Sequence, residues 1–202
     1  GSLEPELLSD EDILRMSRQP KLCPQFHLSL QSGCDKTLKR MNRHYDTAEY
    51  RRIVDKLREC FPSCAITTDI MVGFPGETEE EFKESLAFAR SIQFAKAHVF
   101  AYSIREGTRA AQMEGQLSNA VKETRSRLMI QMTNETAAHF LEEQIGQTVP
   151  VLFESRRNGL GLEGYTPNYS PVVVQTDKPL TGEIHPVHLI KTAEGFCVGK
   201  LL

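Results

Sequence analysis

Four polar or glycine-rich segments follow short apolar runs in the first two-thirds of the sequence, and they contain the side chains best suited to bind a ligand. Where such runs form the strands of a parallel sheet, the segments after them meet at one edge, which is where these proteins bind ligands. Glycine lets the backbone approach a ligand closely, but ordinary strand-to-helix turns favour the same residue types. On this pattern alone, a binding edge and a set of plain turns are equal alternatives. The segments are Glu4-Pro5, Gln31-Ser32-Gly33, Gly73 to Thr78, and Tyr102 to Thr108.

The segment from Gly73 to Thr78 contains the glycines of a phosphate-binding loop without their spacing. Such a loop needs four residues between its glycines and then a lysine. Here two residues separate Gly73 from Gly76, and Glu77 stands where the cation is required. Because a carboxylate repels phosphate, the sequence excludes a nucleotide hydrolase of this type. We expect Glu77 to brace a turn or cap the next helix, and we assign no catalytic residue.

The five cysteines are scattered through strand-like and helix-like contexts. An odd, scattered set argues against a disulfide framework and for a reducing, cytoplasmic location. Cys60 and Cys64 form a C-x-x-x-C pair, but the third ligand of a cluster motif falls at Thr67. We therefore expect structural thiols and no metal site in this chain. His27 and His98 lie inside predicted strands, where a hydrogen-bonded core histidine is the more common role.

The composition is that of an ordinary soluble globular protein, with 40% hydrophobic and 25% charged residues. No apolar run approaches the roughly 20 residues that span a bilayer, so we expect no membrane association. The formal net charge of −3 gives no overall electrostatic signature of nucleic-acid binding. Any contact with RNA must therefore come from local patches.

Strand and helix patterns alternate through the first two-thirds of the chain. This order predicts an α/β fold with parallel strands joined by right-handed crossovers. The last predicted helix is long and has Val121 and Leu128 among its main apolar positions. The predicted strands are a stub at Leu3-Glu4-Pro5 and runs over 26–30, 65–72 and 96–102; the predicted helices begin near Ser9, Asp35, Asp46 or Thr47, Thr78 and Leu117, and the last ends at Ile145.

The pattern changes after Gly146, which provides a helix stop. Five short β-type runs then follow, separated by turn residues, and they predict a small barrel of the oligonucleotide-binding kind. The sequence thus predicts one domain over residues 1–146 and a second over 147–202. The five runs cover residues 149–154, 161–165, 171–175, 183–190 and 196–199.

Several motifs, in order and at suitable spacing, resemble the radical-SAM tRNA methylthiotransferase family. The resemblance implies the C-terminal half of a radical-SAM barrel, a partial parallel (β/α) barrel, followed by a small antiparallel β-barrel, the OB-like TRAM domain. Ser29, where several relatives carry proline, favours the branch that acts on N6-threonylcarbamoyladenosine in tRNA. The motifs are His27-Leu28-Ser29-Leu30-Gln31-Ser32-Gly33 with residues 38–45, then residues 69–78, then residues 99–110, and in the tail Gly164-Tyr165-Thr166-Pro167-Asn168-Tyr169.

The resemblance also shows what this sequence does not contain. Family members begin with a domain that bears three cluster cysteines, followed by a C-x-x-x-C-x-x-C loop, and neither is present here. In the whole enzyme, S-adenosylmethionine (SAM) and two 4Fe-4S clusters add a methylthio group to position 2 of a modified adenosine next to the anticodon. We expect this chain to be a truncated, inactive part that binds none of these cofactors stably.

The same resemblance implies which residues meet SAM. Gln31 and Ser32 would contact its polar groups, and Arg43 would clamp its carboxylate with a forked guanidinium. Arg43 is equally well explained as a solvated charge at a helix end. Gly73 and Phe74 would lie against the adenine, although Phe74 also suits the barrel core.

On the substrate side, the resemblance places Tyr102 and Arg105. An ion pair of Arg105 with Glu106 or Glu77 is the alternative role for that residue.

The macromolecular partners that the resemblance implies are the anticodon stem-loop of tRNA and the missing N-terminal cluster domains. The open barrel edge also suggests self-association. The tail would hold RNA by shape and base stacking, but its five basic and five acidic residues over 148–202 cancel. Tyr165 and Tyr169 are as well explained by strand packing. The tail candidates are Arg156, Arg157, Tyr165, Asn168, Tyr169 and Lys191.

Two other functions remain as alternatives. In the first, the chain is a non-catalytic RNA-binding protein with a degenerate α/β domain. In the second, it is a non-radical α/β enzyme that uses the carboxylates of Glu4, Asp69 and Glu77.

Overall fold

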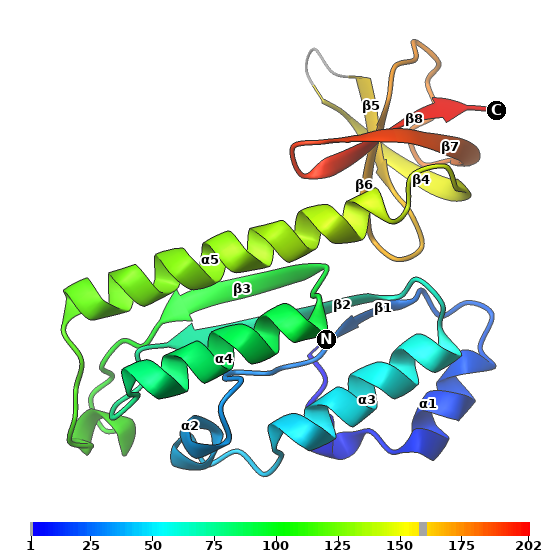
Figure 1. Cartoon of the computed structure of the whole chain (residues 1–202). Helices are drawn as coiled ribbons and strands as arrows, with labels where there is room; N and C mark the ends of the chain where they lie inside the picture. Colours follow the sequence, from blue (N-terminus) through cyan, green and yellow to red (C-terminus); the bar gives the residue numbers. More distant parts are fainter. Residues whose placement is uncertain (1, 158–160) are drawn as a thin grey trace.

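The computed structural model describes residues 2–157 and 161–202 of the chain. A three-stranded sheet with its helices forms the first part, a closed barrel forms the second, and the long helix α5 runs from one to the other (Figure 1). The helices are η1 Pro5–Leu7, α1 Asp10–Ser17, α2 Asp35–Arg40, α3 Thr47–Cys60, α4 Glu79–Ile92, η2 Ala110–Gln112 and α5 Asn119–Glu142; the strands are β1 Gln25–His27, β2 Ala65–Val72, β3 Lys96–Ala101, β4 Thr148–Arg157, β5 Gly161–Tyr165, β6 Pro171–Val174, β7 Ile184–Ala193 and β8 Phe196–Leu201.

The first sheet has the strand order β1-β2-β3, and both pairings are parallel. This confirms the parallel α/β fold predicted from the alternating pattern. Strand β1 is shorter than the predicted run because Leu28 and Gln31 pair through isolated bridges, with Leu3 and Ile70 respectively. The bridge to Leu3 also confirms the strand stub predicted near the start of the sequence.

Helix starts follow the predicted capping residues. Ser9 accepts from Asp12 N–H at 3.1 Å, and Thr78 accepts from Glu81 N–H at 3.2 Å. In both cases the acidic side chain reaches back to the N–H of the capping residue, which completes a capping box. Asp46, one of the two predicted alternatives, caps α3.

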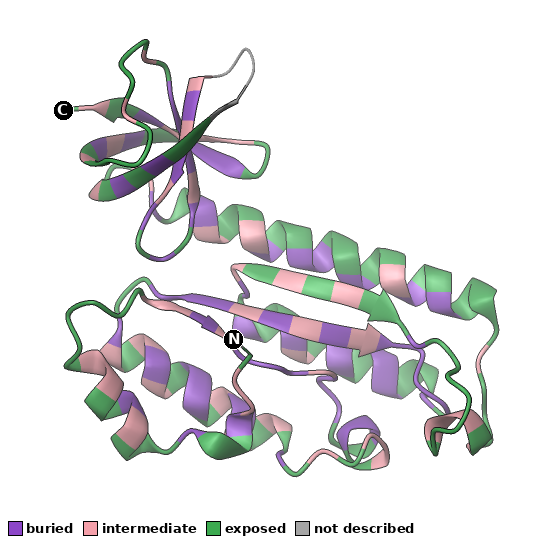
Figure 2. Cartoon of the chain, turned by 180° about the vertical axis from the view of Figure 1, so that it is seen from behind, coloured by how far each residue is buried: buried purple, intermediate pink, exposed green. Residues whose placement is uncertain are grey.

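One face of the sheet packs against α3, α4 and α5 in a single apolar core. The sheet contributes alternate residues such as Phe26, Ile66 and Ile70, as the period of a strand requires. Figure 2 shows the same alternation as changing burial along β2 and β3. The other face is polar, which is unusual for a parallel sheet, since such sheets are normally covered on both sides.

Two histidines on that polar face correct the expectation that they belong to the core. His98 is exposed and His27 is half-buried. Strand alternation turns both away from the helices. His27 contacts Thr67 Oγ1 through Nδ1 at 3.0 Å and Asp69 Oδ2 through Nε2 at 3.3 Å.

Helix α5 buries some of its predicted apolar positions, such as Met132 and Leu141, but not those in its first half. Val121 and Leu128 are 38% and 42% exposed, whereas Lys122 and Arg125 are buried beside the sheet. The helix is therefore oriented by polar contacts near its first turn and by Met129 and the neighbouring apolar residues further along.

The five strands of the second part close into a barrel, as predicted, and their order in the barrel is β4-β5-β6-β8-β7. The expectation of a wholly antiparallel barrel is corrected at one place, since β6 and β8 pair in parallel. The core of the barrel includes Leu141 from the end of α5. The barrel therefore rests on the helix that leaves the sheet, as Figure 1 shows. Its core residues are Leu141, Val151, Phe153, Leu162, Val172, Val174, Val187, Leu189 and Cys197.

No helix among the described residues is both long enough and apolar enough to cross a membrane.

Candidate functional site

The loops that follow the strands meet at one edge of the sheet, as predicted. Because β1, β2 and β3 are parallel, their carboxyl ends lie on the same side. Gln31 N–H donates to the Asp69 carbonyl at 2.9 Å, and Tyr102 N–H donates to the Val72 carbonyl at 2.9 Å. These bonds hold neighbouring loops side by side. We call this the carboxyl edge, and it consists of residues 31–33, 73–78 and 102–108 with Glu4 beside them.

The first loop of the carboxyl edge is tightly held. Gln31 has a φ of 63°, which is uncommon for a residue with a side chain. Ser32 is fully buried, and its Oγ accepts from Cys34 N–H at 3.3 Å. Gly33 N–H donates to Ser85 Oγ on α4 at 2.8 Å. Of the two predicted cofactor ligands in this loop, Gln31 is half-buried at the edge, whereas Ser32 supports the turn from within.

Arg43 lies at the edge but already has a partner. Its Nη1 is 3.2 Å from Glu4 Oε2, and the two side chains are 30% and 39% exposed. The pair connects the loop after α2 to the segment after the Leu3 bridge. At this exposure the attraction between the two side chains is largely screened by solvent. Arg43 therefore has a weak ion-pair partner, which neither the solvated charge nor the cofactor clamp expected from the sequence included.

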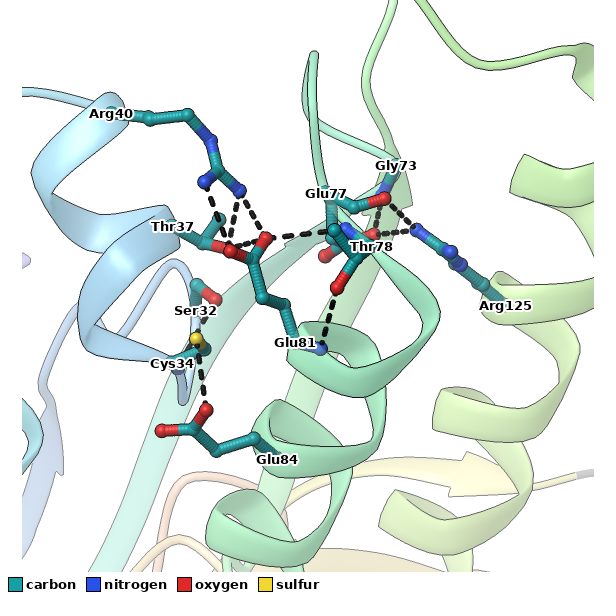
Figure 3. A network of polar contacts seen from close by, with 10 residues as sticks. All are labelled: Ser32, Cys34, Thr37, Arg40, Gly73, Glu77, Thr78, Glu81, Glu84 and Arg125. Carbon is teal, nitrogen blue, oxygen red and sulfur yellow. Dashed lines mark hydrogen bonds and ion pairs between the residues drawn. The ribbon is translucent and has the colours of Figure 1, made fainter. Parts of the chain in front are cut away.

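The second loop is built around a buried ion pair. Glu77 Oε2 accepts from Gly73 N–H at 2.8 Å and from Arg125 Nη1 at 2.6 Å, and Arg125 also donates to the Glu77 carbonyl at 3.0 Å (Figure 3). The Glu77 and Arg125 side chains are 1% and 6% exposed. Burial raises the pKa of the Glu77 carboxyl above its usual range, against the opposing effect of Gly73 N–H and Arg125. Glu77 thus braces the turn, as expected, and its ion-pair partner is Arg125 instead of Arg105.

A second polar cluster links α2 to the start of α4 (Figure 3). Arg40 holds both carboxylate oxygens of Glu81, one through Nη1 at 3.0 Å and the other through Nη2. The Arg40 guanidinium lowers the pKa of the Glu81 carboxyl. Because Glu81 also completes the capping box with Thr78, α4 is fixed at the point where the second loop ends. These contacts make the carboxyl edge rigid before any ligand binds.

Phe74 and Tyr102 pack against each other at the edge. Their ring centroids are 5.4 Å apart with an interplanar angle of 72°, and both residues are buried. The Tyr102 hydroxyl has no hydrogen-bond partner within the described part of the chain. The ammonium of Lys122 lies 5.2 Å from the centroid of the Tyr102 ring. Arg105, the other predicted substrate residue, is exposed.

Sequence reasoning missed the contribution of α5 to this edge. Lys122 and Arg125 are three residues apart and share one side of the helix. A signal was present, because the first turn of α5 contains no acidic residue although such residues are favoured there. Apolar periodicity pointed to the wrong side of the helix at Val121 and Leu128, although it was right at Met132 and Leu141.

The barrel presents a stacked pair of tyrosines beside the sheet. The Tyr165 and Tyr169 rings are 4.7 Å apart at an angle of 19°. Tyr169 is 63% exposed and has a φ of 67°, a strained value for an aromatic residue. Both tyrosines line a groove of about 810 Å³, together with His27 and His98 from the polar face of the sheet. The exposed ring favours a stacking role for Tyr169 over packing within the barrel.

Asn168, one of the predicted RNA contacts, makes hydrogen bonds within the protein. It is buried, and its Nδ2 donates to the Ser63 carbonyl at 2.9 Å and to Gln144 Oε1 at 3.1 Å. Its Oδ1 lies within hydrogen-bonding distance of the Thr166 and Ser170 hydroxyls. Both polar atoms of this side chain are engaged, and they join the barrel to the sheet part.

The other tail candidates are less constrained. Lys191 is exposed on β7. Arg156 and Arg157 lie at the end of β4, and their side chains lie outside the described part of the structure.

The cysteines do not gather into a cluster site. All five are free thiols, and burial raises the pKa of the Cys64 thiol to about 11. No group of three or more His, Cys, Asp or Glu side chains suited to a metal ion occurs among residues 2–157 and 161–202. The residues present therefore do not fit an iron–sulfur cluster, whereas the carboxyl edge, with the unpaired Tyr102 hydroxyl, fits a polar organic ligand.

Comparisons with known proteins agree with this architecture. Residues 2–89 match the family model of the radical SAM superfamily, and residues 142–202 match that of the TRAM domain. The solved structure of coproporphyrinogen III oxidase from Escherichia coli, a radical SAM enzyme, superposes with a TM-score of 0.53 at 18% identity. This likeness covers 72% of this chain and 33% of that one, and it concerns the fold alone. The chain is thus a radical SAM α/β domain joined to a TRAM domain.

Two curated relatives make the family more specific. Both are called tRNA-2-methylthio-N(6)-dimethylallyladenosine synthase. The protein from Caldicellulosiruptor saccharolyticus is 38% identical over 98% of this chain, and that from Methylacidiphilum infernorum is 38% identical over 90%. The chain spans 42% and 40% of the length of these relatives. The chain belongs to the radical-SAM tRNA methylthiotransferase family.

The names of these relatives differ from the branch that Ser29 favoured. They specify dimethylallyladenosine, whereas Ser29 favoured threonylcarbamoyladenosine. In the structure, Ser29 is buried and its hydroxyl lies 2.6 Å from Ser2 Oγ.

The buried ion pair gives a direct prediction. Arg125→Met leaves the Glu77 carboxylate buried without its cation, and we expect a loss of about 3–5 kcal/mol in the free energy of unfolding. The double variant Glu77→Gln, Arg125→Met removes both charges and should lose less than the two single changes added together. Urea unfolding followed by circular dichroism measures all three.

Arg127→Met is the matched control, because Arg127 lies on the same helix and is exposed. It should change the free energy of unfolding by no more than about 0.5 kcal/mol. Additive losses in the double variant would contradict the importance of this pair.

A second prediction concerns Gly73, whose φ is +72°. A Cβ at this position would lie 2.6 Å from Lys122 Cγ. Gly73→Ala should therefore be more destabilising than Gly107→Ala, because Gly107 has a similar φ of +80° with no atom within 4 Å of its would-be Cβ. The expected difference in thermal or urea unfolding is about 1–3 kcal/mol. It should shrink when Lys122 is also changed to Ala, and an unchanged difference would rule out the contact as its cause.

Proposed function

We propose that this chain is the SAM-side and RNA-binding part of an enzyme that adds a methylthio group to position 2 of a modified adenosine next to the anticodon of tRNA. The observation that carries the proposal is the role of α5. Its first turns pack into the carboxyl edge through Arg125, and its last turn supports the TRAM barrel through Leu141. One rigid helix therefore fixes the distance between a cofactor edge and an RNA-binding surface.

Within this proposal, the carboxyl edge holds SAM. Gln31 offers a polar side chain, and Gly73 lets the ligand approach the loop backbone closely. Phe74 and Tyr102 form an apolar wall that excludes water from one side of the ligand. When bound, SAM supplies the radical chemistry and the methyl group, while this chain supplies orientation. In the whole enzyme, one iron–sulfur cluster would supply the electron for the radical chemistry and a second would supply sulfur, while the residues of this chain would hold SAM.

The proposed RNA partner is the anticodon stem-loop. An exposed aromatic ring stacks on any unpaired base, and this interaction requires little net charge. Tyr169 provides such a ring next to the groove between the barrel and the sheet. We also propose the division into residues 1–146 and 147–202, a cytoplasmic location, and a requirement for cluster-bearing domains in the active enzyme. Without those domains, the chain should be inactive and the outer strands of its sheet should favour self-association.

Deleting the gene that encodes this chain tests the function. We expect tRNA from the deletion strain to lose the 2-methylthio group on the adenosine next to the anticodon, as measured by mass spectrometry of digested nucleosides. The modification on N6 should persist, and its mass identifies the substrate as threonylcarbamoyladenosine or dimethylallyladenosine. Unchanged methylthio nucleosides would contradict the proposal and favour a non-catalytic RNA-binding protein.

The stacking role of Tyr169 has its own test in this chain. Tyr169→Ala should weaken binding of an anticodon stem-loop RNA by roughly fivefold to 100-fold, because one base loses its stacking partner. Tyr169→Phe keeps the ring and should bind within about twofold of the parent chain. Fluorescence anisotropy at several salt concentrations measures both variants. Equal binding by the Ala and Phe variants would remove Tyr169 from the RNA surface.

A further inference from the structure

Two buried cations lie near the start of α5, and their charges are compensated differently. Lys122 and Arg125 are 7% and 5% exposed. Arg125 pairs with Glu77, and its Nη2 also lies 3.6 Å from Glu79. Lys122 has no ion pair and no hydrogen-bond acceptor among the side chains and backbone of the described residues. The ammonium nitrogen of Lys122 keeps some contact with solvent, because it is not one of the fully buried atoms without a hydrogen-bond partner. A cation near a helix N-terminus is nevertheless disfavoured by the helix dipole.

The position of Lys122 is nevertheless well defined. Its stem lies against Gly73, where a side chain would leave no room for it. Its ammonium lies 5.2 Å from the centroid of the Tyr102 ring. Such a cation–π contact is attractive, but it accepts none of the three hydrogen bonds that an ammonium can donate. The contact holds the ammonium in place and leaves its donors unused.

Tyr102, whose ring the ammonium contacts, supplies a second unused donor. Its hydroxyl is buried and has no partner in the described part of the chain, although more than nine in ten buried polar groups have one. Tyr102 is itself only 8% exposed and packs between Phe74 and Lys122. Two buried residues in contact with each other thus both lack an acceptor.

We propose that Lys122 and Tyr102, with the N-terminal turn of α5, form a binding site for an oxyanion at the carboxyl edge. An oxyanion would accept from the ammonium and from the hydroxyl, and the positive end of a 24-residue helix would add to the attraction. Glu77 does not occupy the site, since its carboxylate is held by Gly73 N–H and Arg125. The site rests on the proposed function only for the source of the anion, which is the carboxylate of SAM or a phosphate of RNA.

Inorganic phosphate tests the site without reference to SAM or RNA. Titration of the isotope-labelled whole chain, followed by amide NMR, should shift the signals of Gly73, Tyr102 and the first turn of α5. Lys122→Met has a similar shape without the charge, and it should weaken phosphate binding about tenfold. Lys122→Arg should retain most of the affinity. Lys83→Met, on the exposed side of α4, should bind phosphate as the parent chain does.

Binding of two further ligands, compared between the parent chain and Lys122→Met, identifies which molecule supplies the anion. S-adenosylhomocysteine carries the amino-acid carboxylate, and 5′-methylthioadenosine lacks it. If Lys122→Met weakens binding of the first and not the second, the site holds the carboxylate of the cofactor. If it weakens only stem-loop RNA, the site holds a phosphate. If it weakens neither while inorganic phosphate still depends on Lys122, the oxyanion site stands for a ligand other than these.

Two results would overturn the proposal. One is equal phosphate affinity in the parent chain and Lys122→Met, whether or not that variant is less stable to urea, because Lys122 then serves packing alone. The other is a phosphate response confined to residues away from the carboxyl edge. Failure of the parent chain to bind stem-loop RNA would count against the proposed function and would leave the phosphate result unaffected.

Discussion

The buried ion pair between Glu77 and Arg125 is the contact on which the arrangement of this protein depends. Glu77 closes the loop after β2 by accepting from Gly73 N–H, and Arg125 belongs to the helix that supports the barrel. A buried carboxylate needs its cation, so the helix is fixed in both rotation and position along its axis. The loop, the helix and the barrel are therefore coupled through one pair of side chains.

This coupling explains why α5 buries two cations near its start while the apolar side chains of Val121 and Leu128 remain exposed. A helix that served only to cover the sheet would turn Val121 and Leu128 inward. Instead, Arg125 and Lys122 face the carboxyl edge, and Met129 and Met132 fill the core further along. Burying two cations in place of apolar side chains lowers the stability of the fold, and it places both cations at the carboxyl edge. Local departures of this kind are common at functional sites.

Rigidity is the common property of the two surfaces. The carboxyl edge is held by the capping box of Thr78 and Glu81 and by the Arg40–Glu81 pair before any ligand is present. The stacked tyrosines are held because Asn168 joins their loop to the end of α5 and to the Ser63 carbonyl. Surfaces fixed in this way lose little conformational entropy when they bind. Under the proposed function, this part of the protein would serve to position its ligands.

The sequence by itself determined the local elements. Helix caps at Ser9 and Thr78, the buried strand Ala65–Val72 and the five barrel strands follow from short-range rules, because capping and strand alternation involve residues near each other in the chain. The motifs also identified the family. Tertiary structure alone decided which polar side chains find hydrogen-bond or ion-pair partners. By residue type, Asn168 and Lys122 would both be expected at the surface. In the structure, Asn168 is buried with both polar atoms hydrogen-bonded, whereas Lys122 is largely buried and has no anionic partner among the described residues. Such outcomes depend on partners such as Ser63, 105 residues away from Asn168, and periodicity carries no information about contacts at that separation.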